Sequence, residues 1–328
     1  MSFEDLTVKK NQMETVLPFP ADVLGELRRE LDLETASVGI CFDGGSLTRR
    51  ETELVLFQDK VVPDHSLTEH IRVLNMSTAF RMIFDQMQQH TPRPFDENDI
   101  KNLHRILVRE LDDKNGGMYR GFSMTFPLGD LDLPDPALVH RKMDEIGMWL
   151  FSVRTLHPVA VAADVHLRLL SVHPFAEGNG AVARMMMNMI LMRSGYPPAL
   201  FSRREKNEYW QTLKAAIYDN DRTGYDRLVY RAVNRGLELY LKSGRLKKVE
   251  AVETEPYFLR IGQLAKETGE RVSTLRYWTS LGILSPAGKT SADYMIFSSD
   301  VLETVRRLKE LKAKRLTLEE IKKELQQA

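Results

Sequence analysis

Residues 173–184 read His-Pro-Phe-Ala-Glu-Gly-Asn-Gly-Ala-Val-Ala-Arg, and a helix-forming run follows to Arg193. The two glycines around Asn179 stand at the entrance of that helix, where backbone N–H groups converge on one point and the helix dipole favours an anion. Glu177 lies where it can hold a hard cation against the anion. His173 is the side chain in this run that can take a proton near neutral pH. The stretch therefore predicts transfer of a phosphate-linked group from a magnesium nucleotide to a hydroxyl.

These residues resemble the signature of the Fic family, His-Pro-Phe-x-(Asp/Glu)-Gly-Asn-Gly-Arg-x-x-Arg. Eleven of the twelve positions fit, and the exception is Ala181, where the family usually has its first arginine. Most Fic proteins transfer AMP from ATP to a Ser, Thr or Tyr hydroxyl of a target protein. The resemblance therefore implies a protein adenylyltransferase that uses ATP and Mg²⁺. A hydrogen bond to a charged group contributes ~1.5–3 kcal/mol, so Ala181 predicts a reaction slowed roughly 10- to 150-fold.

The resemblance implies a role for each residue of the site. His173 is the base that accepts the proton of the target hydroxyl, and Glu177 binds the metal together with the α- and β-phosphates. Arg184, the second signature arginine, contacts the γ-phosphate. Asn179 holds the loop and an α-phosphate oxygen. The nucleotide-binding residues implied are Gly178, Asn179, Gly180, Arg184, Tyr209 and Trp210.

Two further segments extend the resemblance to roughly residues 15–240. The pair Tyr209-Trp210 resembles two adjacent tyrosines that line the family's nucleotide pocket; the alternative is that both are core aromatics. Residues 118–136 resemble the β-hairpin flap that docks the target peptide, with strands expected near 121–125 and 131–133. Such a flap pairs with the target through the backbone, so the target's sequence matters little.

A third segment resembles a regulatory element. Many Fic proteins carry an inhibitory helix with the pattern (Ser/Thr)-x-x-x-Glu-(Gly/Asn), whose glutamate pairs with the second signature arginine. Residues 39–44 read Gly-Ile-Cys-Phe-Asp-Gly, with Gly39 at the hydroxyl position and Asp43 in place of the glutamate. Asp43 is therefore the inhibitory candidate. Because its side chain is one methylene shorter, we expect it to fall short of Arg184 and to inhibit only weakly.

Helical patterning dominates the chain up to about residue 242. Segments 158–172 and 181–193 are apolar around most of their circumference, so both are predicted to be central helices, with the methionines of 185–192 in the core. We predict a mainly α fold, a Fic-type helical core with a short β-hairpin flap, followed by a winged helix-turn-helix domain. The expected parts are an N-terminal helical region (1–110) with the candidate inhibitory segment near 37–48, a catalytic core (111–242), a linker (243–256) and a C-terminal module (257–328).

The C-terminal module shows two short helices joined at Gly269, a helix-turn-helix pattern. Ser273 is expected to cap the second helix. Residues 294–297 are expected to supply a wing strand, and 300–311 and 316–325 two further helices. The pattern resembles the MerR-type winged helix, whose second helix enters the major groove of DNA; the alternative is a protein-docking module. The DNA-binding candidates are Thr274, Arg276, Tyr277 and Lys289.

Composition adds broader limits. The 328 residues carry 46 basic and 46 acidic side chains, but 17 basic and 12 acidic residues lie from Lys242 onward, so the basic surface belongs to the C-terminal part. Cys41 is the single cysteine, which excludes an intrachain disulfide and is typical of a reducing cytoplasm. The sequence predicts neither an export signal nor a membrane span, because no apolar run approaches ~18 residues.

Three functions remain open from the sequence. The first is a protein adenylyltransferase directed by its C-terminal module to duplex DNA or a regulated partner. The second is a nucleotide-sensing transcriptional regulator with a degenerate Fic domain. The third is a Fic-fold enzyme that removes AMP or transfers another phosphate-linked group. His173 and Glu177 favour an enzyme, whereas Ala181 and Ile217, which replaces an asparagine of the family pattern, favour a sensor. Residues up to Ala328 contain no long dimerising helix of the MerR type, so we expect a homodimer formed through the Fic-like part.

Overall fold

The computed structural model describes residues 2–88, 96–126, 133–250, 258–289, 295–298, 300–313, 316 and 318–326. The chain forms two compact units, Met1–Leu246 and Lys247–Ala328. The regions 1–110 and 111–242 thus share one unit. The boundary between the units falls inside the expected linker 243–256, but residues 243–250 are helical, because no proline interrupts the helix before Pro256.

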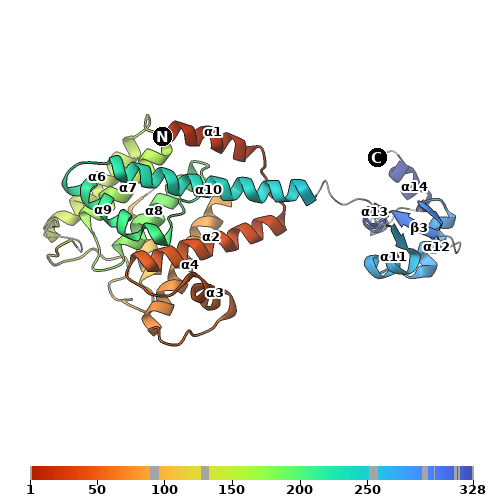
Figure 1. The fold of residues 1–328 in the computed structure, drawn as a ribbon, viewed down its shortest axis with the longest axis horizontal. Helices are drawn as coiled ribbons and strands as arrows, with labels where there is room; N and C mark the ends of the chain where they lie inside the picture. The colour runs from red at the N-terminus through yellow and green to blue at the C-terminus, as the bar shows by residue number, and fades with distance from the viewer. Residues whose placement is uncertain are drawn as a thin grey trace. The chain divides into compact units, whose positions relative to one another are not determined.

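The first unit is built from helices (Figure 1). In chain order they are α1 (Phe3–Glu14), α2 (Ala21–Phe42), α3 (Arg49–Gln58), α4 (Leu67–Gln88), α5 (Glu97–Leu107), α6 (Pro136–Ser152), α7 (Pro158–Val172), α8 (Asn179–Arg193), the 3-10 helix η1 (Arg203–Glu205), α9 (Lys206–Tyr218) and α10 (Thr223–Glu250). Thr48 and Asp96 begin α3 and α5 with capping boxes. Proline stands at the first position of α6 and α7, where its fixed φ fits the helix. In the described ranges of the chain, no helix is long and apolar enough to span a bilayer.

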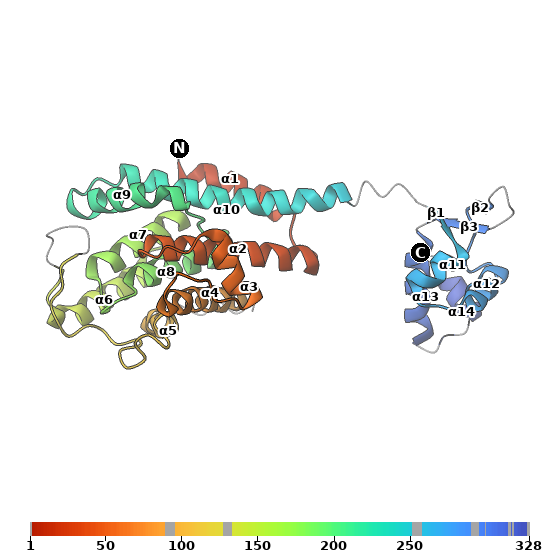
Figure 2. The same ribbon diagram turned by 60° about the horizontal axis from the view of Figure 1, so that its bottom comes forward.

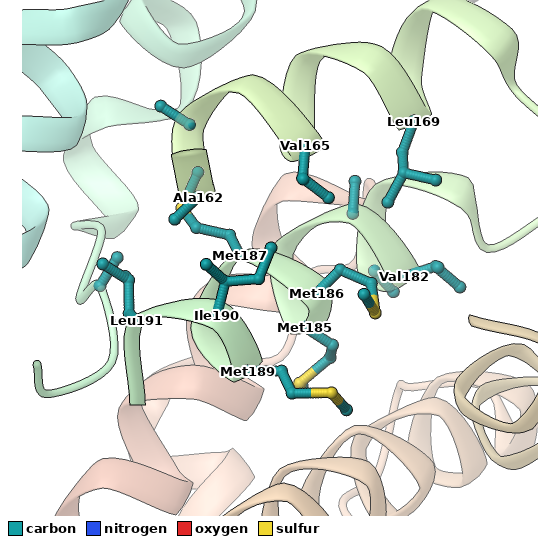
Figure 3. Packing of buried hydrophobic residues seen from close by; sticks show 14 of the residues in the cluster. Ala162, Val165, Leu169, Val182, Met185, Met186, Met187, Met189, Ile190 and Leu191 are labelled. Atoms are coloured by element: carbon teal, nitrogen blue, oxygen red, sulfur yellow. The ribbon is translucent and has the colours of Figure 1, made fainter. Parts of the chain in front are cut away.

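Helices α7 and α8 form the centre of this unit, as their apolar patterning predicts. The α7 helix has the predicted bounds, whereas α8 begins two residues earlier than predicted, because Gly178 takes a φ of 74° and caps it. Met185, Met186 and Met187 are each at most 1% exposed and pack among Ala162, Val165 and Ile190 (Figure 3). Burial of each such side chain contributes about 1.5–3 kcal/mol. The start of α8 is therefore anchored in the buried core of the unit.

The N-terminal helix closes the unit by lying along α10 (Figures 1 and 2). Lys9 Nζ donates to Asn234 Oδ1 at 2.6 Å and to Glu238 Oε1 at 2.9 Å. Thr7 Oγ1 lies 2.9 Å from both His157 Nε2 and the Tyr196 hydroxyl, which joins α1 to the start of α7.

The second unit is a small winged helix-turn-helix (Figure 2). Its sheet has the order β1-β3-β2, with all neighbours antiparallel. Trp278, Leu264 and Phe297 are buried between the sheet and the helices. The elements are β1 (Phe258–Arg260), α11 (Ile261–Thr268), α12 (Val272–Ser280), β2 (Gly288–Lys289), β3 (Met295–Ser298), α13 (Val301–Ala313) and α14 (Leu318–Gln326).

The structure corrects two local predictions. Arg271, not Ser273, is the N-cap of α12, and Ser273 lies within the helix, because the helical turn already begins at Val272 after the extended backbone of Arg271. The expected flap lies partly in residues 127–132, which are outside the described residues. Of its first expected strand, 121–125, Thr125 alone is bridged, and Leu133 N donates to Met124 O at 3.4 Å. A single bridge of this kind is too short to form a strand.

Candidate active site

A cavity of about 590 Å³ opens at the N-terminal end of α8. It brings most of the signature residues together with side chains from helices far apart in the sequence. The lining includes His173, Glu177, Gly178, Asn179, Gly180, Ala181, Asp43, Arg72, Lys206 and Trp210. The remaining wall is largely apolar, which excludes water from the polar end.

His173 ends α7 in the left-handed conformation, with a φ of 49°. This turn directs the chain into the predicted phosphate loop, residues 174–180, and leaves His173 8% exposed in the cavity wall. Nδ1 lies 3.4 Å from Leu170 O, and because a carbonyl only accepts, Nδ1 carries the proton and Nε2 is free to take one. Burial lowers the pKa of His173 to about 4, so the ring is neutral at pH 7.

Arg120 holds the backbone around His173 in place. Its Nε donates to His173 O at 2.8 Å, its Nη2 donates to Pro134 O at 2.6 Å, and its own N–H donates to Pro174 O at 2.8 Å. The side chain is buried, and burial lowers the pKa of Arg120. One guanidinium thus ties the end of α7 to the start of α6. The sequence analysis missed Arg120, because nothing local marks contacts that span more than 50 residues.

A second pair of contacts shapes the phosphate loop. Asn179 Oδ1 accepts from Phe175 N at 2.9 Å, and its Nδ2 donates to Phe175 O at 2.8 Å. His104 Nδ1 accepts from Gly117 N at 2.8 Å, so Nε2 carries the proton and donates to Glu177 O at 3.2 Å. The His104 ring stacks on Phe175 at 3.8 Å, and burial lowers the pKa of His104 to about 4. Asn179 therefore holds the loop as predicted, and His104 is a further support that the sequence did not reveal.

Glu177 faces the cavity from the loop and forms an ion pair. Its Oε2 lies 3.1 Å from Nη2 of Arg72 on α4, and both side chains are about two-fifths exposed. The described part of the chain has no group of three or more His, Cys, Asp or Glu side chains that could hold a metal ion by themselves. A single accessible carboxylate fits Mg²⁺, which usually takes one or two carboxylates and completes its shell with water and substrate phosphates.

Asp43 reaches Arg184, contrary to the prediction from its short side chain. Asp43 Oδ2 lies 2.7 Å from Arg184 Nη2, which also lies 3.3 Å from Gly39 O. The contact forms because Asp43 caps the end of α2, so the backbone brings the carboxylate close. Burial acts to lower the pKa of Arg184, but the Asp43 carboxylate and the Tyr209 hydroxyl together outweigh it and raise that pKa. A side chain on Gly180 would meet Asp43 Oδ1 at 3.0 Å, so the pair sits directly beside the loop.

The two aromatic candidates, Tyr209 and Trp210, differ in their position relative to the cavity. Trp210 lines the cavity, whereas Tyr209 is fully buried beneath it and does not. The Tyr209 hydroxyl lies 2.8 Å from His166 Nε2, and His166 Nδ1 lies 2.9 Å from the Tyr225 hydroxyl. Burial lowers the pKa of His166 to about 3, which keeps it neutral. Tyr209 is thus a core aromatic, and of the pair Trp210 alone is placed to contact a nucleotide.

The DNA-binding candidates lie on the second unit. Arg276 is exposed and Tyr277 is 54% exposed on α12, while Thr274 is half-buried on the same helix. Lys289 is in β2, which pairs with β3 in the wing. Leu275 and Trp278 face the core instead, so α12 presents one polar face and one apolar face.

Comparison with known proteins gives matches to both units. Residues 94–191 match the family model described as Fic/DOC family, and residues 259–328 match MerR HTH family regulatory protein. Curated relatives are called protein adenylyltransferase Fic. The Drosophila yakuba protein is 33% identical over 207 residues, which are 62% of this chain and 40% of the relative. The Drosophila melanogaster protein is also 33% identical over 207 residues, which are 62% of this chain and 41% of the relative. The matched part thus spans about two fifths of the length of these relatives.

Solved structures show the same fold. Fic-1 from C. elegans has a TM-score of 0.65 at 25% identity, covering 73% of this chain and 70% of that chain. A Fic family protein from Desulfovibrio desulfuricans has a TM-score of 0.58 at 17% identity and covers 90% of this chain and 95% of its own. At that identity the likeness shows the fold alone. The chain is therefore similar to Fic/DOC family proteins over residues 94–191 and to MerR HTH family regulatory proteins over residues 259–328.

Proposed function

We propose that the first unit transfers AMP from ATP to a hydroxyl group of a target protein. The observation that carries the proposal is a neutral, buried His173 in the wall of the cavity that also holds the glycine-flanked start of α8. The name of the curated relatives, protein adenylyltransferase Fic, supports the same chemistry.

In this reaction the α-phosphate lies at the N-terminal end of α8, where Gly178, Asn179 and Gly180 offer backbone N–H groups and the helix dipole. The hydroxyl oxygen attacks the α-phosphorus, its proton passes to His173 Nε2, and pyrophosphate leaves. The negative charge of the bound triphosphate raises the pKa of His173 from about 4, which makes the ring a stronger base. Arg120 and His104 act only by holding the loop and the histidine in position.

Glu177 is the residue that would hold Mg²⁺, which supplies neutralisation of phosphate charge when it is bound. Arg72 must then leave the Glu177 carboxylate. Ala181 gives the phosphates no cation, so we expect the transfer to be attenuated by roughly 10- to 150-fold relative to a signature with arginine.

The Asp43–Arg184 pair is the proposed inhibitory contact. Arg184 is the expected ligand of the γ-phosphate, and in this structure its Nη2 is bonded to Asp43 at 2.7 Å. A carboxylate at this place also repels a phosphate. The triphosphate therefore has to displace Asp43, and the protein is expected to rest in a low-activity state.

The target and the oligomer are further parts of the proposal. Residues 118–136 are proposed to dock the target in extended form through the backbone. A homodimer formed through the first unit would place two MerR-type units on one duplex, because DNA-binding modules of this class read paired half-sites.

The test is incubation with Mg²⁺ and α-labelled ATP, alone and with cell lysate. Label should appear on the protein itself or on lysate proteins and vanish with His173→Ala, while nucleotide binding stays nearly unchanged. His140→Ala, which removes an exposed histidine from α6, is the matched control and should keep the label. Equal labelling by the wild type and His173→Ala would rule out this mechanism.

A second candidate is a nucleotide-sensing transcriptional regulator. The MerR-type domain on the same chain favours it, together with the alanine at position 181. A sensor would bind ATP without labelling any protein, and its affinity for DNA would change with the bound nucleotide.

A further inference from the structure

We propose that Arg72 supplies the triphosphate contact that Ala181 cannot make. The inference rests on the proposed binding of ATP in the cavity, and it concerns how this chain binds the phosphates without the first signature arginine. Arg72 lies outside the signature, on α4, and nothing in the sequence singled it out.

The first observation is the placement of Arg72. Its side chain lines the same cavity as Ala181 and the phosphate loop. Its Nη2 lies 3.1 Å from Glu177 Oε2, one residue before Gly178, so the guanidinium already stands beside the loop. The side chain is 42% exposed and is not fixed by burial, so it is free to change partners.

The second observation is the charge of the cavity. Among the described lining residues the acids are Asp43 and Glu177, and the cations are Arg72 and Lys206. His173 is neutral at pH 7, so the lining has no excess of positive charge. Arg184 does not line the cavity and is engaged by Asp43. Of the two lining cations, Arg72 is the one already paired with a residue of the loop, and its fork of donors suits phosphate oxygens, so a polyphosphate entering the cavity is expected to recruit it.

Binding of the nucleotide itself favours the exchange. A cation at Glu177 repels the guanidinium, and a phosphate attracts it. In the free protein Arg72 neutralises Glu177, and in the complex it bonds to phosphate oxygens instead. The rival explanation is that Arg72 serves only to neutralise Glu177, in which case its removal would leave phosphate binding unchanged or tighten it.

The experiment measures equilibrium binding of ATP and of adenosine by calorimetry. It uses the full chain carrying Asp43→Gly, so that the inhibitory pair does not obstruct the phosphates, and it is run both with Mg²⁺ and with EDTA. Three further variants are compared in this background: Arg72→Ala, Ala181→Arg and both together. Arg50→Ala removes an exposed arginine of α3 that does not line the cavity and is the matched control.

Arg72→Ala should weaken ATP binding about tenfold in either buffer, the lower end for a charged hydrogen bond at a partly exposed site. Adenosine affinity should stay within twofold, and Arg50→Ala should change neither. Adding Ala181→Arg to the Arg72→Ala variant should restore its affinity for ATP, because the new guanidinium bonds to the phosphate oxygens in place of Arg72. Unchanged or tighter ATP binding in Arg72→Ala would overturn the inference. This binding experiment is independent of the transfer reaction. If the protein binds ATP through Arg72 but labels no target, the inference about Arg72 stands and the proposed transfer of AMP is wrong.

Discussion

At the scale of single residues, the loss of one methylene does not release Arg184 from its carboxylate. Asp43 is shorter than the glutamate of the family pattern, yet its carboxylate lies 2.7 Å from Arg184. The end of α2 compensates for the short side chain by bringing its backbone nearer. Arg184 is 6% exposed, and its Nη1 has no hydrogen-bond partner among the described residues, so a further acceptor at Nη1 would complete the site.

Removal of this carboxylate should increase the proposed transfer of AMP. Asp43→Gly frees Arg184 for the γ-phosphate, and a charged hydrogen bond corresponds to roughly 10- to 150-fold in rate. We therefore expect transfer of label from α-labelled ATP to rise at least tenfold. The same change leaves a buried guanidinium without its partner, so the free energy of unfolding should fall by ~1–3 kcal/mol.

Asp59→Gly is the matched control for that change. Asp59 ends α3 with a φ of 50°, which glycine adopts without strain, and it does not line the cavity. It should leave the transfer rate unchanged. A rate for Asp43→Gly within twofold of the wild type would show that the pair does not inhibit.

At the scale of elements, sequence patterning predicted the helices better than their contacts. The 158–172 and 181–193 segments were recognisable because both are apolar on nearly every side, and only a central helix buries all of them. Pro158 marked the start of the first helix, whereas the second begins at Asn179, two residues before the predicted start. Residues 243–250 were expected to be a linker or a frayed helix end, because their charged residues and Gly244 are typical of a linker, and they form the last part of α10.

The contacts that position the site could not be read from the sequence. Arg120, His104 and Arg72 lie 53, 73 and 105 residues from their partners His173 and Glu177. No local spacing links residues so far apart, and for Arg72 and His104 it is the packing of α4 and α5 against α8 that brings Glu177 near. For Tyr209 the sequence left a core role and a pocket role open, and its full burial favours the core role.

The support that Arg120 gives to α7 is open to test. Arg120→Gln keeps a polar side chain but loses most of the bonds to carbonyls at His173 and Pro134. We expect kcat to fall at least tenfold through misplacement of His173, with little change in the affinity for ATP, because Arg120 does not line the cavity. Arg141→Gln, an exposed arginine on α6, should leave kcat unchanged. A loss of ATP affinity equal to the loss of kcat would point to collapse of the whole site instead.

At the scale of the whole molecule, buried histidines make the first unit sensitive to acid. Burial lowers the pKa of His104 and of His173 to about 4 and that of His166 to about 3. The unfolded chain holds these groups near 6.5, so it binds more protons than the folded chain between those values. Stability is therefore complete above about pH 6.5 and falls as the pH drops toward 4, by up to about 1.4 kcal/mol per pH unit for each histidine.

Unfolding followed by circular dichroism between pH 7 and pH 4.5 checks this expectation. The slope of the free energy of unfolding against pH reports how many more protons the unfolded chain binds, and His166→Gln should lower that number by about one, whatever it does to stability at pH 7. His140→Gln, at an exposed site, should leave the slope as it is. A stability that is flat over this range would contradict the burial of neutral histidines.

The second unit gives the molecule its expected link to DNA. If α12 enters the major groove and β2 follows the backbone, then Arg276→Ala and Lys289→Ala should each lower the salt slope of binding by about 1, since each neutralised phosphate releases counterions. Fluorescence anisotropy of full-length protein with duplex fragments at two salt concentrations measures this. Arg306→Ala on α13 is the control, because that exposed side chain pairs with Glu303. If no duplex fragment changes the anisotropy and Arg276→Ala has no effect, the unit is better interpreted as a protein-docking domain.

The buried thiol at the end of α2 offers a way to follow the contact between Asp43 and Arg184. Cys41 is the single cysteine of the chain, stands two residues before Asp43 and is 8% exposed. A thiol-reactive dye should therefore label the resting protein slowly, and its reaction rate should rise when the last turn of α2 loosens from Arg184. Asp43→Gly should react faster than the wild type, and ATP should accelerate labelling of the wild type if the triphosphate displaces Asp43. The release of inhibition would then be visible in one spectroscopic signal, without an added probe site and without knowledge of the target.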